Sequence, residues 1–214
     1  MDKKTIIAVI GKTSSGKDTV AKVLNEKYGI PSVVSMTTRP KREYETNGVE
    51  HIFISKEEMS NILKEKTIIA YTKNDKTGIE YCAALEALPS NTCVYIINPD
   101  GVKWLKEYNK HNLFNLICVY VDLAEDKIIK RGLLRGDNPD TLRIRLESER
   151  EEFDAYKNSK EYDFLITNDK DLQYLYHQVD LFYSRYFWII LKKRWQKTPL
   201  FFYVKKWVIK SVIY

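Results

Sequence analysis

A glycine-rich segment near the start of the sequence has the composition of a phosphate-binding loop. Gly11, Gly16 and Lys17 meet the spacing G-x-x-x-x-G-K. The residues between them are Lys12, Thr13, Ser14 and Ser15. Glycines let backbone N–H groups approach a phosphate closely, and the lysine adds a positive charge that reaches toward the β- and γ-phosphates. We therefore expect this loop to bind a nucleoside triphosphate; a β-to-α turn without a ligand is the alternative.

The residue after the lysine bears on how a metal ion is held. A Ser or Thr usually stands there, and its hydroxyl contacts Mg²⁺. In this chain the residue is Asp18, and Thr19 follows it. Both side chains offer the oxygen ligands that a hard cation prefers. Two alternatives stay open: Thr19 takes the metal after a small shift, or Asp18 holds it directly or through water.

Short apolar runs that alternate with segments of helical length must position this loop. The runs are rich in Val, Ile and Tyr and cover residues 5–10, 92–97, 113–121 and 162–167. The helical segments cover residues 18–28, 100–109, 124–131, 141–157 and 169 to about 185. This alternation predicts an α/β fold with a parallel sheet and helices on both faces.

Residues 33–88 interrupt the alternation with Thr, Arg, Pro, Asn and Gly clusters around short strand-like pieces. We expect a small mixed insert beside the phosphate loop, because ligands of open α/β sheets bind at the carboxyl ends of the strands. Within it, Arg39 and Arg42 can grip one phosphate with forked donors. A solvated basic loop is the alternative.

Composition excludes several classes of protein. Of 214 residues, 44% are hydrophobic and 30% charged, which argues against disorder. The three cysteines show no C-x-x-C spacing, and the N-terminus leaves no room for a signal peptide, so a cytoplasmic location is expected. Eight of the 35 Lys and Arg residues lie in residues 181–214, which hold no acid. The positive net charge therefore belongs to a tail, and no nucleic-acid partner is expected for the main domain.

Taken together, the motifs resemble those of guanylate kinases over residues 5 to about 180. The matching segments are residues 11–19, Ser35 to Arg42, Asn47 to Phe53, Gly101-Val102, Arg131 with Arg135, Arg145-Leu146, and residues 162–169. The resemblance implies a P-loop NTPase-type fold and transfer of the ATP γ-phosphoryl group to a nucleoside monophosphate, GMP or dGMP above all, with Mg²⁺ as cofactor.

The resemblance also implies roles for individual residues. Lys17 and the lid arginines, Arg131, Arg135 and Arg145, would act on the transferring group, and Asn168 would contact the adenine. The acceptor nucleotide would be bound by Ser35, Arg39, Arg42, His51, Tyr81 and Asn98. Such catalysis needs no protein nucleophile, because phosphoryl transfer depends on positioning and on stabilising charge on the phosphate oxygens.

The predicted domain covers residues 1–183. It consists of a core (1–34 and 89–183), the insert (35–88) and a lid at about 131–145, and a basic aromatic tail follows at 184–214. Residues 181–214 carry eleven aromatic residues among the eight cations. Packing or self-association is the first interpretation, with contact to a membrane surface or to bases as alternatives. No oligomeric state is predicted.

The sequence departs from the guanylate kinase pattern where the acceptor base would be read. Ala70 stands where an acid is expected, Ala83 where a hydroxyl is expected, and Ile96 where an acid is expected. A site without such groups discriminates poorly between bases. Two further hypotheses follow: a kinase with altered base specificity, or a non-catalytic binding module of the same fold.

Overall fold

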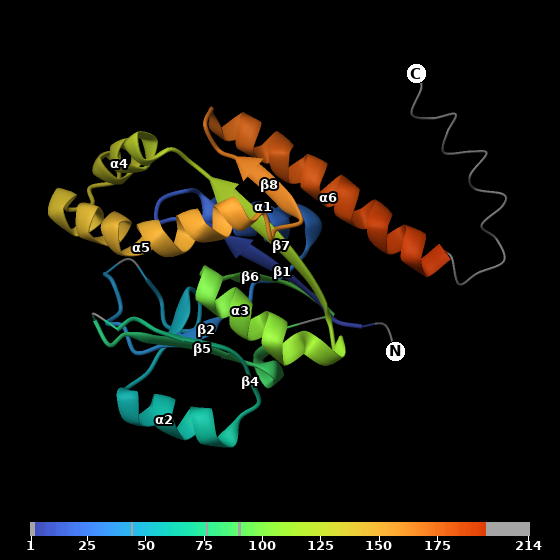
Figure 1. Ribbon diagram of the computed structural model, residues 1–214, viewed down its shortest axis with the longest axis horizontal. Helices are drawn as coiled ribbons and strands as arrows, with labels where there is room; N and C mark the ends of the chain where they lie inside the picture. Colours follow the sequence, from blue (N-terminus) through green and yellow to red (C-terminus); the bar gives the residue numbers. More distant parts are fainter. Residues whose placement is uncertain (1–2, 44, 76, 90, 196–214) are drawn as a thin grey trace.

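The structure is a computed structural model that describes residues 3–195 apart from 44, 76 and 90 (Figure 1). A four-stranded parallel sheet forms its centre. In the order in which they lie, its strands are β6 (Thr92–Ile96), β1 (Thr5–Ile10), β7 (Asn115–Asp122) and β8 (Phe164–Thr167). The sheet confirms the predicted α/β fold, and the four strands lie within two residues of the expected bounds.

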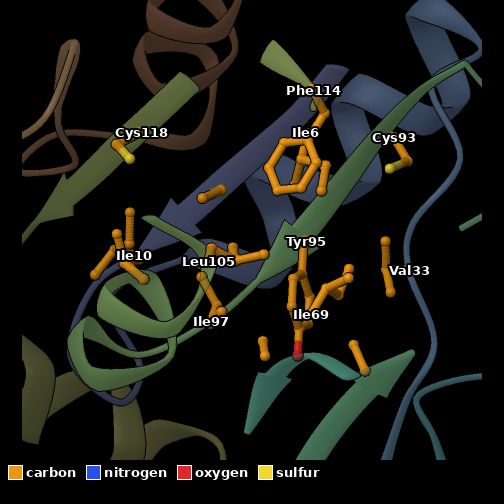
Figure 2. Packing of buried hydrophobic residues seen from close by; sticks show 14 of the residues in the cluster. Ile6, Ile10, Val33, Ile69, Cys93, Tyr95, Ile97, Leu105, Phe114 and Cys118 are labelled. Atoms are coloured by element: carbon orange, nitrogen blue, oxygen red, sulfur yellow. The ribbon is translucent and has the colours of Figure 1, made fainter. Parts of the chain in front are cut away.

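Side chains of β1 alternate between two hydrophobic clusters, one on each face of the sheet. Ile7 and Val9 pack with residues of α1 (Lys17–Tyr28) and α6 (Leu172–Trp195). Ile6, Ala8 and Ile10 pack on the other face, where Leu105 of α3 (Pro99–Tyr108) and Phe153 of α5 (Pro139–Ser159) meet them. Figure 2 shows part of this second cluster. Every residue of β1 is buried, which explains its continuous apolar sequence.

The insert forms a second, mixed sheet, as predicted. Its strands lie in the order β3 (His51–Phe53), β2 (Ser35–Thr37), β5 (Glu80–Ala84) and β4 (Ile68–Lys73). The β2–β3 pair is parallel and the other pairs are antiparallel. Helix α2 (Lys56–Glu65) begins with a capping box of Ser55 and Glu58 and buries Met59 against the sheet.

Helix α4 (Glu125–Leu134) and the first half of α5 form the region predicted as a lid. Asn138 caps α5 by accepting hydrogen bonds from two backbone N–H groups, and Pro139 starts the helix. The helices touch at Gly132, where an added Cβ would lie 2.4 Å from Cδ2 of Leu142. A larger residue at this position would require the Leu142 side chain to move.

Helix α6 is longer than the sequence pattern indicates. It was expected to end near residue 185, yet it is helical to Trp195. No Gly or Pro interrupts the sequence before Pro199, so nothing stops the helix earlier. The rest of the tail lies outside the described residues. Two 3₁₀ turns, η1 (Leu85–Ala87) and η2 (Asn109–His111), complete the elements. Within the described part of the chain, no helix combines the length and apolarity needed to cross a membrane.

Candidate active site

The phosphate loop connects the carboxyl end of β1 to α1, as predicted. Gly16 adopts a left-handed conformation with φ of 102°, and an added Cβ there would lie 2.4 Å from Nδ2 of Asn168. An added Cβ at Gly11 would lie 2.5 Å from the carbonyl oxygen of Val121. Gly11 is therefore required by its close approach to the backbone of β7, and Gly16 by its positive φ.

Lys17 reaches back across the loop. Its Nζ donates a hydrogen bond of 2.9 Å to the carbonyl oxygen of Lys12, at the other end of the segment. Burial lowers the pKa of Lys17, while the carboxylates of Asp18 and Glu149 act in the opposite direction. Burial has the largest effect on the pKa of this ammonium group, and the charges of neighbouring residues modify it.

Lys12 was expected to bind ATP, but its side chain is engaged elsewhere. Its Nζ lies 2.8 Å from a carboxylate oxygen of Glu125 on α4 and 2.8 Å from one of Asp154 on α5. Lys12 is only 8% exposed. Arg150 and Lys12 together lower the pKa of Glu125 to about 2. The side chain of Lys12 therefore ties the phosphate loop to α4 and α5. The carbonyl oxygen of Lys12 is the group that accepts the hydrogen bond from Lys17.

Two of the three lid arginines lie near Lys17. Arg135 donates a hydrogen bond of 3.0 Å to Oγ of Ser14 in the loop and pairs with Asp137. The charges of Arg145 and Arg135 both act to lower the pKa of Lys17. Positive charge from Arg135, which follows α4, and from Arg145 on α5 thus acts on the lysine of the loop.

The third lid arginine, Arg131, lies with Asn168 beside the loop. Arg131 donates to the carbonyl oxygens of Asn168 and Lys170, at 3.0 and 3.3 Å. Asn168 is 3% exposed, and its Nδ2 donates a hydrogen bond of 2.8 Å to the carbonyl oxygen of Ser15. Its side chain therefore braces the phosphate loop in this structure.

Most residues predicted to bind the acceptor come together in the insert. Arg39 donates to Glu45 through two hydrogen bonds of 2.8 and 2.7 Å, and its Nε lies 3.3 Å from the hydroxyl of Tyr81. Arg42 lies 3.8 Å from the same carboxylate. The hydrogen bonds from Arg39, together with the backbone N–H and the charge of Arg42, lower the pKa of Glu45 to about 2. Sequence reasoning missed Glu45, although its place three residues after Arg42 was a usable signal.

Ser35 and His51 extend this cluster from the neighbouring strands. Ser35 Oγ lies 2.9 Å from Nδ1 of His51, and the His51 ring meets the Tyr81 ring edge to face at 5.7 Å. Burial, with the charge of Arg39, lowers the pKa of His51. Asn98 has a different role in the structure, because its Oδ1 caps α3 by accepting from the backbone N–H of Gly101 at 3.0 Å.

Comparison with known proteins identifies the family. The guanylate kinase family model matches residues 2–186. The chain belongs to the guanylate kinase family. It is 30% identical over 177 residues to a guanylate kinase of Clostridium tetani, covering 79% of this chain and 81% of that protein. It is 29% identical to a guanylate kinase of Mycoplasmopsis pulmonis, covering 78% and 87%.

A solved structure supports the fold. The crystal structure of guanylate kinase from Anaplasma phagocytophilum superposes with a TM-score of 0.60 at 19% identity, over 92% of this chain and 89% of that one. Members of the guanylate kinase family are ATP-dependent nucleoside monophosphate kinases, and this chain is one of these phosphotransferases.

Three apolar residues, Ala70, Ala83 and Ile96, were expected to stand together in place of base-reading groups, and the structure differs at the third. Ala70 and Ala83 pair across β4 and β5, are 2% and 0% exposed, and pack with Ile97. Figure 2 shows Ile97 beside Leu105, in the cluster that also contains Ile69 of β4. Ile96, which was expected there, packs instead against the cluster under α1 and α6. Ile97, the residue directly after β6, lies on the opposite side of the sheet from Ile96 and takes that place.

The guanylate kinase loop offers oxygen ligands that suit Mg²⁺. Asp18 is exposed in the first turn of α1, and Thr19 is half-buried beside it. Oγ of Ser15 is buried and has no hydrogen-bond partner within the described residues. The described part of the chain holds no group of three or more His, Cys, Asp or Glu residues able to bind a metal. The oxygen atoms of Asp18, Thr19 and Ser15 are ligands of the kind that a hard cation such as Mg²⁺ prefers.

Proposed function

We propose that this kinase transfers the γ-phosphoryl group of ATP to GMP or dGMP. The ATP phosphates lie on residues 11–19, and the acceptor's phosphate lies between Arg39, Arg42 and Tyr81. One observation carries the proposal: in a chain that the guanylate kinase model matches over residues 2–186, Arg39, Arg42 and Tyr81 gather in the insert around the carboxylate of Glu45. This cluster of two guanidinium groups and a hydroxyl suits the phosphate of an acceptor nucleotide.

The chemistry proposed for these residues is electrostatic. Lys17, Arg135 and Arg145 stabilise the negative charge that develops on the phosphate oxygens during transfer. Glu45 fixes the fork of Arg39, so that the acceptor's phosphate meets a guanidinium already oriented. Mg²⁺, held by Asp18 or Thr19, would neutralise charge on the nucleotide phosphates.

The test is a panel of ribo- and deoxynucleoside monophosphates with ATP consumption as the readout. We expect turnover with GMP and dGMP. Absence of turnover with every monophosphate would contradict the proposal. The matched variant Arg39→Ala should raise the KM for the acceptor and leave the KM for ATP nearly unchanged.

Relaxed base specificity is a second candidate, supported by the buried apolar residues Ala70, Ala83 and Ile97, which stand where base-reading groups were expected. These side chains offer no hydrogen-bonding group, and sites that read a base reject others by leaving buried polar groups unpaired. The same panel decides between the two. A kcat/KM for GMP at least about a hundredfold above those for AMP, CMP, UMP and dTMP would exclude relaxed specificity.

A further inference from the structure

A carboxylate from α5 contacts the phosphate loop. Oε2 of Glu149 accepts a hydrogen bond of 2.7 Å from the backbone N–H of Thr13. Glu149 is half-buried, and it stands four residues after Arg145 on the same face of the helix. An acid therefore lies on an amide of a loop whose amides bind phosphate in proteins of this kind.

The charge of Glu149 is also felt by Lys17. The carboxylate acts to raise the pKa of Lys17, which burial lowers. Lys17 donates to the carbonyl of the peptide group that joins Lys12 to Thr13, and Glu149 accepts from the N–H of the same peptide group. This peptide group thus carries the ammonium on one side and the carboxylate on the other.

Other contacts hold α5 in place independently of Glu149. Lys12 pairs with Asp154 at 2.8 Å, and Arg150 pairs with Glu125 of α4 at 2.9 Å. The helix is therefore tied to the loop and to α4 by Arg150 and Asp154, which follow Glu149 in the sequence. Loss of the Glu149 contact alone leaves these ties intact.

We propose that Glu149 is a specificity-determining residue of the donor site that weakens the binding of ATP relative to ADP. The inference rests on the proposed function, in which the nucleotide phosphates lie on residues 11–19. A γ-phosphate oxygen that approaches the amide of Thr13 meets a carboxylate already bound there, and the two negative charges repel. ADP lacks the γ-phosphate and escapes this repulsion, so ATP binding requires the carboxylate to move away.

The test compares two substitutions that separate charge from structure. Glu149→Gln keeps an oxygen that can accept from Thr13 and removes the charge, and Glu149→Ala removes both. The Kd values of ATP and ADP with Mg²⁺ are measured by calorimetry for each variant and for the wild-type protein. Glu147→Gln is the matched control, because Glu147 is an exposed acid two residues away on the same helix.

We expect both Glu149 variants to tighten ATP binding at least about fivefold relative to ADP, because like charges in contact are strongly unfavourable. The control should leave the ratio of the two Kd values unchanged. An unchanged ratio in Glu149→Gln, an equal change in Glu147→Gln, or weaker ATP binding in both Glu149 variants would overturn the inference. If the wild-type protein bound neither nucleotide, the proposed function itself would fail; if it bound both and the ratio stayed constant, only this inference would.

Discussion

The carboxylate of Glu45 holds the guanidinium of Arg39 through two parallel hydrogen bonds of 2.8 and 2.7 Å. Both side chains are largely buried. The guanidinium carbon of Arg39 also lies over the Phe53 ring, 5.3 Å from its centroid. A basic segment that could have been a solvated loop therefore holds a largely buried ion pair. The acceptor cluster depends on an acid as much as on its arginines.

Removing the charge of Glu45 should therefore weaken acceptor binding. We expect Glu45→Gln to raise the KM for GMP about tenfold, because each hydrogen bond to a charged group contributes about 1.5–3 kcal/mol and a neutral amide makes a weaker partner for Arg39. Steady-state kinetics with GMP varied at saturating ATP measure the effect. An unchanged KM would mean that Arg39 is positioned without Glu45. Glu50→Gln, an exposed acid nearby in the sequence, serves as the control.

The same pair should make stability depend on pH at the acidic side. The pKa of Glu45 falls from its ordinary value near 4.5 to about 2 in the folded protein. A depressed carboxyl pKa stabilises the fold above the unfolded pKa, and this contribution is lost as pH falls from about 4.5 to about 2. The melting temperature should therefore fall more steeply between pH 6 and 3 for the wild-type protein than for Glu45→Gln. Parallel curves would show that the pair does not contribute.

Lys17 should be essential for turnover and dispensable for folding. We expect Lys17→Met to lower kcat at least about a hundredfold, as the loss of one donor to developing charge does in other active sites. The methionine keeps the aliphatic volume, so the melting temperature should change little. ATP consumption and a thermal melt of the same sample check both statements. Near-normal turnover would contradict the donor site.

Lys12 should contribute to stability through its two carboxylate partners. We expect Lys12→Met to lower the free energy of unfolding by about 2 kcal/mol, because it removes hydrogen bonds to two charged groups that are partly shielded from solvent. The control is Lys22→Met, whose 3.8 Å pair with Glu26 is well exposed and should contribute less than about 0.5 kcal/mol. Urea unfolding of both variants gives the comparison, and equal losses would argue against the tie to the lid helices.

The sequence predicts the parts of the site that depend on local spacing. The phosphate loop follows from a glycine pattern within seven residues, and Arg39 with Arg42 from a separation of three. The roles of Asn168 and Glu149 could not be predicted in this way. Their partners in the loop are 153 and 136 residues distant in the sequence, and only the fold brings them together.

Other differences arise from choices that a single sequence leaves open. Whether Ile96 or Ile97 faces the insert depends on the alternation along β6 and on where the strand ends, and a shift of one residue reverses the answer. The side chain of Lys12 could have pointed to the nucleotide or away from it. The tertiary pairing with Glu125 and Asp154 decides, and neither acid is marked out in the sequence from the other acids of its helix.

Asp137 is influenced by the charges of Arg145 from the lid and Arg42 from the insert, and this has a consequence for how the two nucleotides bind. A phosphate bound by Arg42 would change the charge that acts on Asp137, so we expect the occupancy of one site to affect the affinity of the other. Thermodynamic linkage makes any such effect reciprocal: whatever factor GMP applies to the Kd of ATP, ATP applies to the Kd of GMP. Measuring the Kd of each nucleotide with and without the other gives that factor twice, from independent experiments.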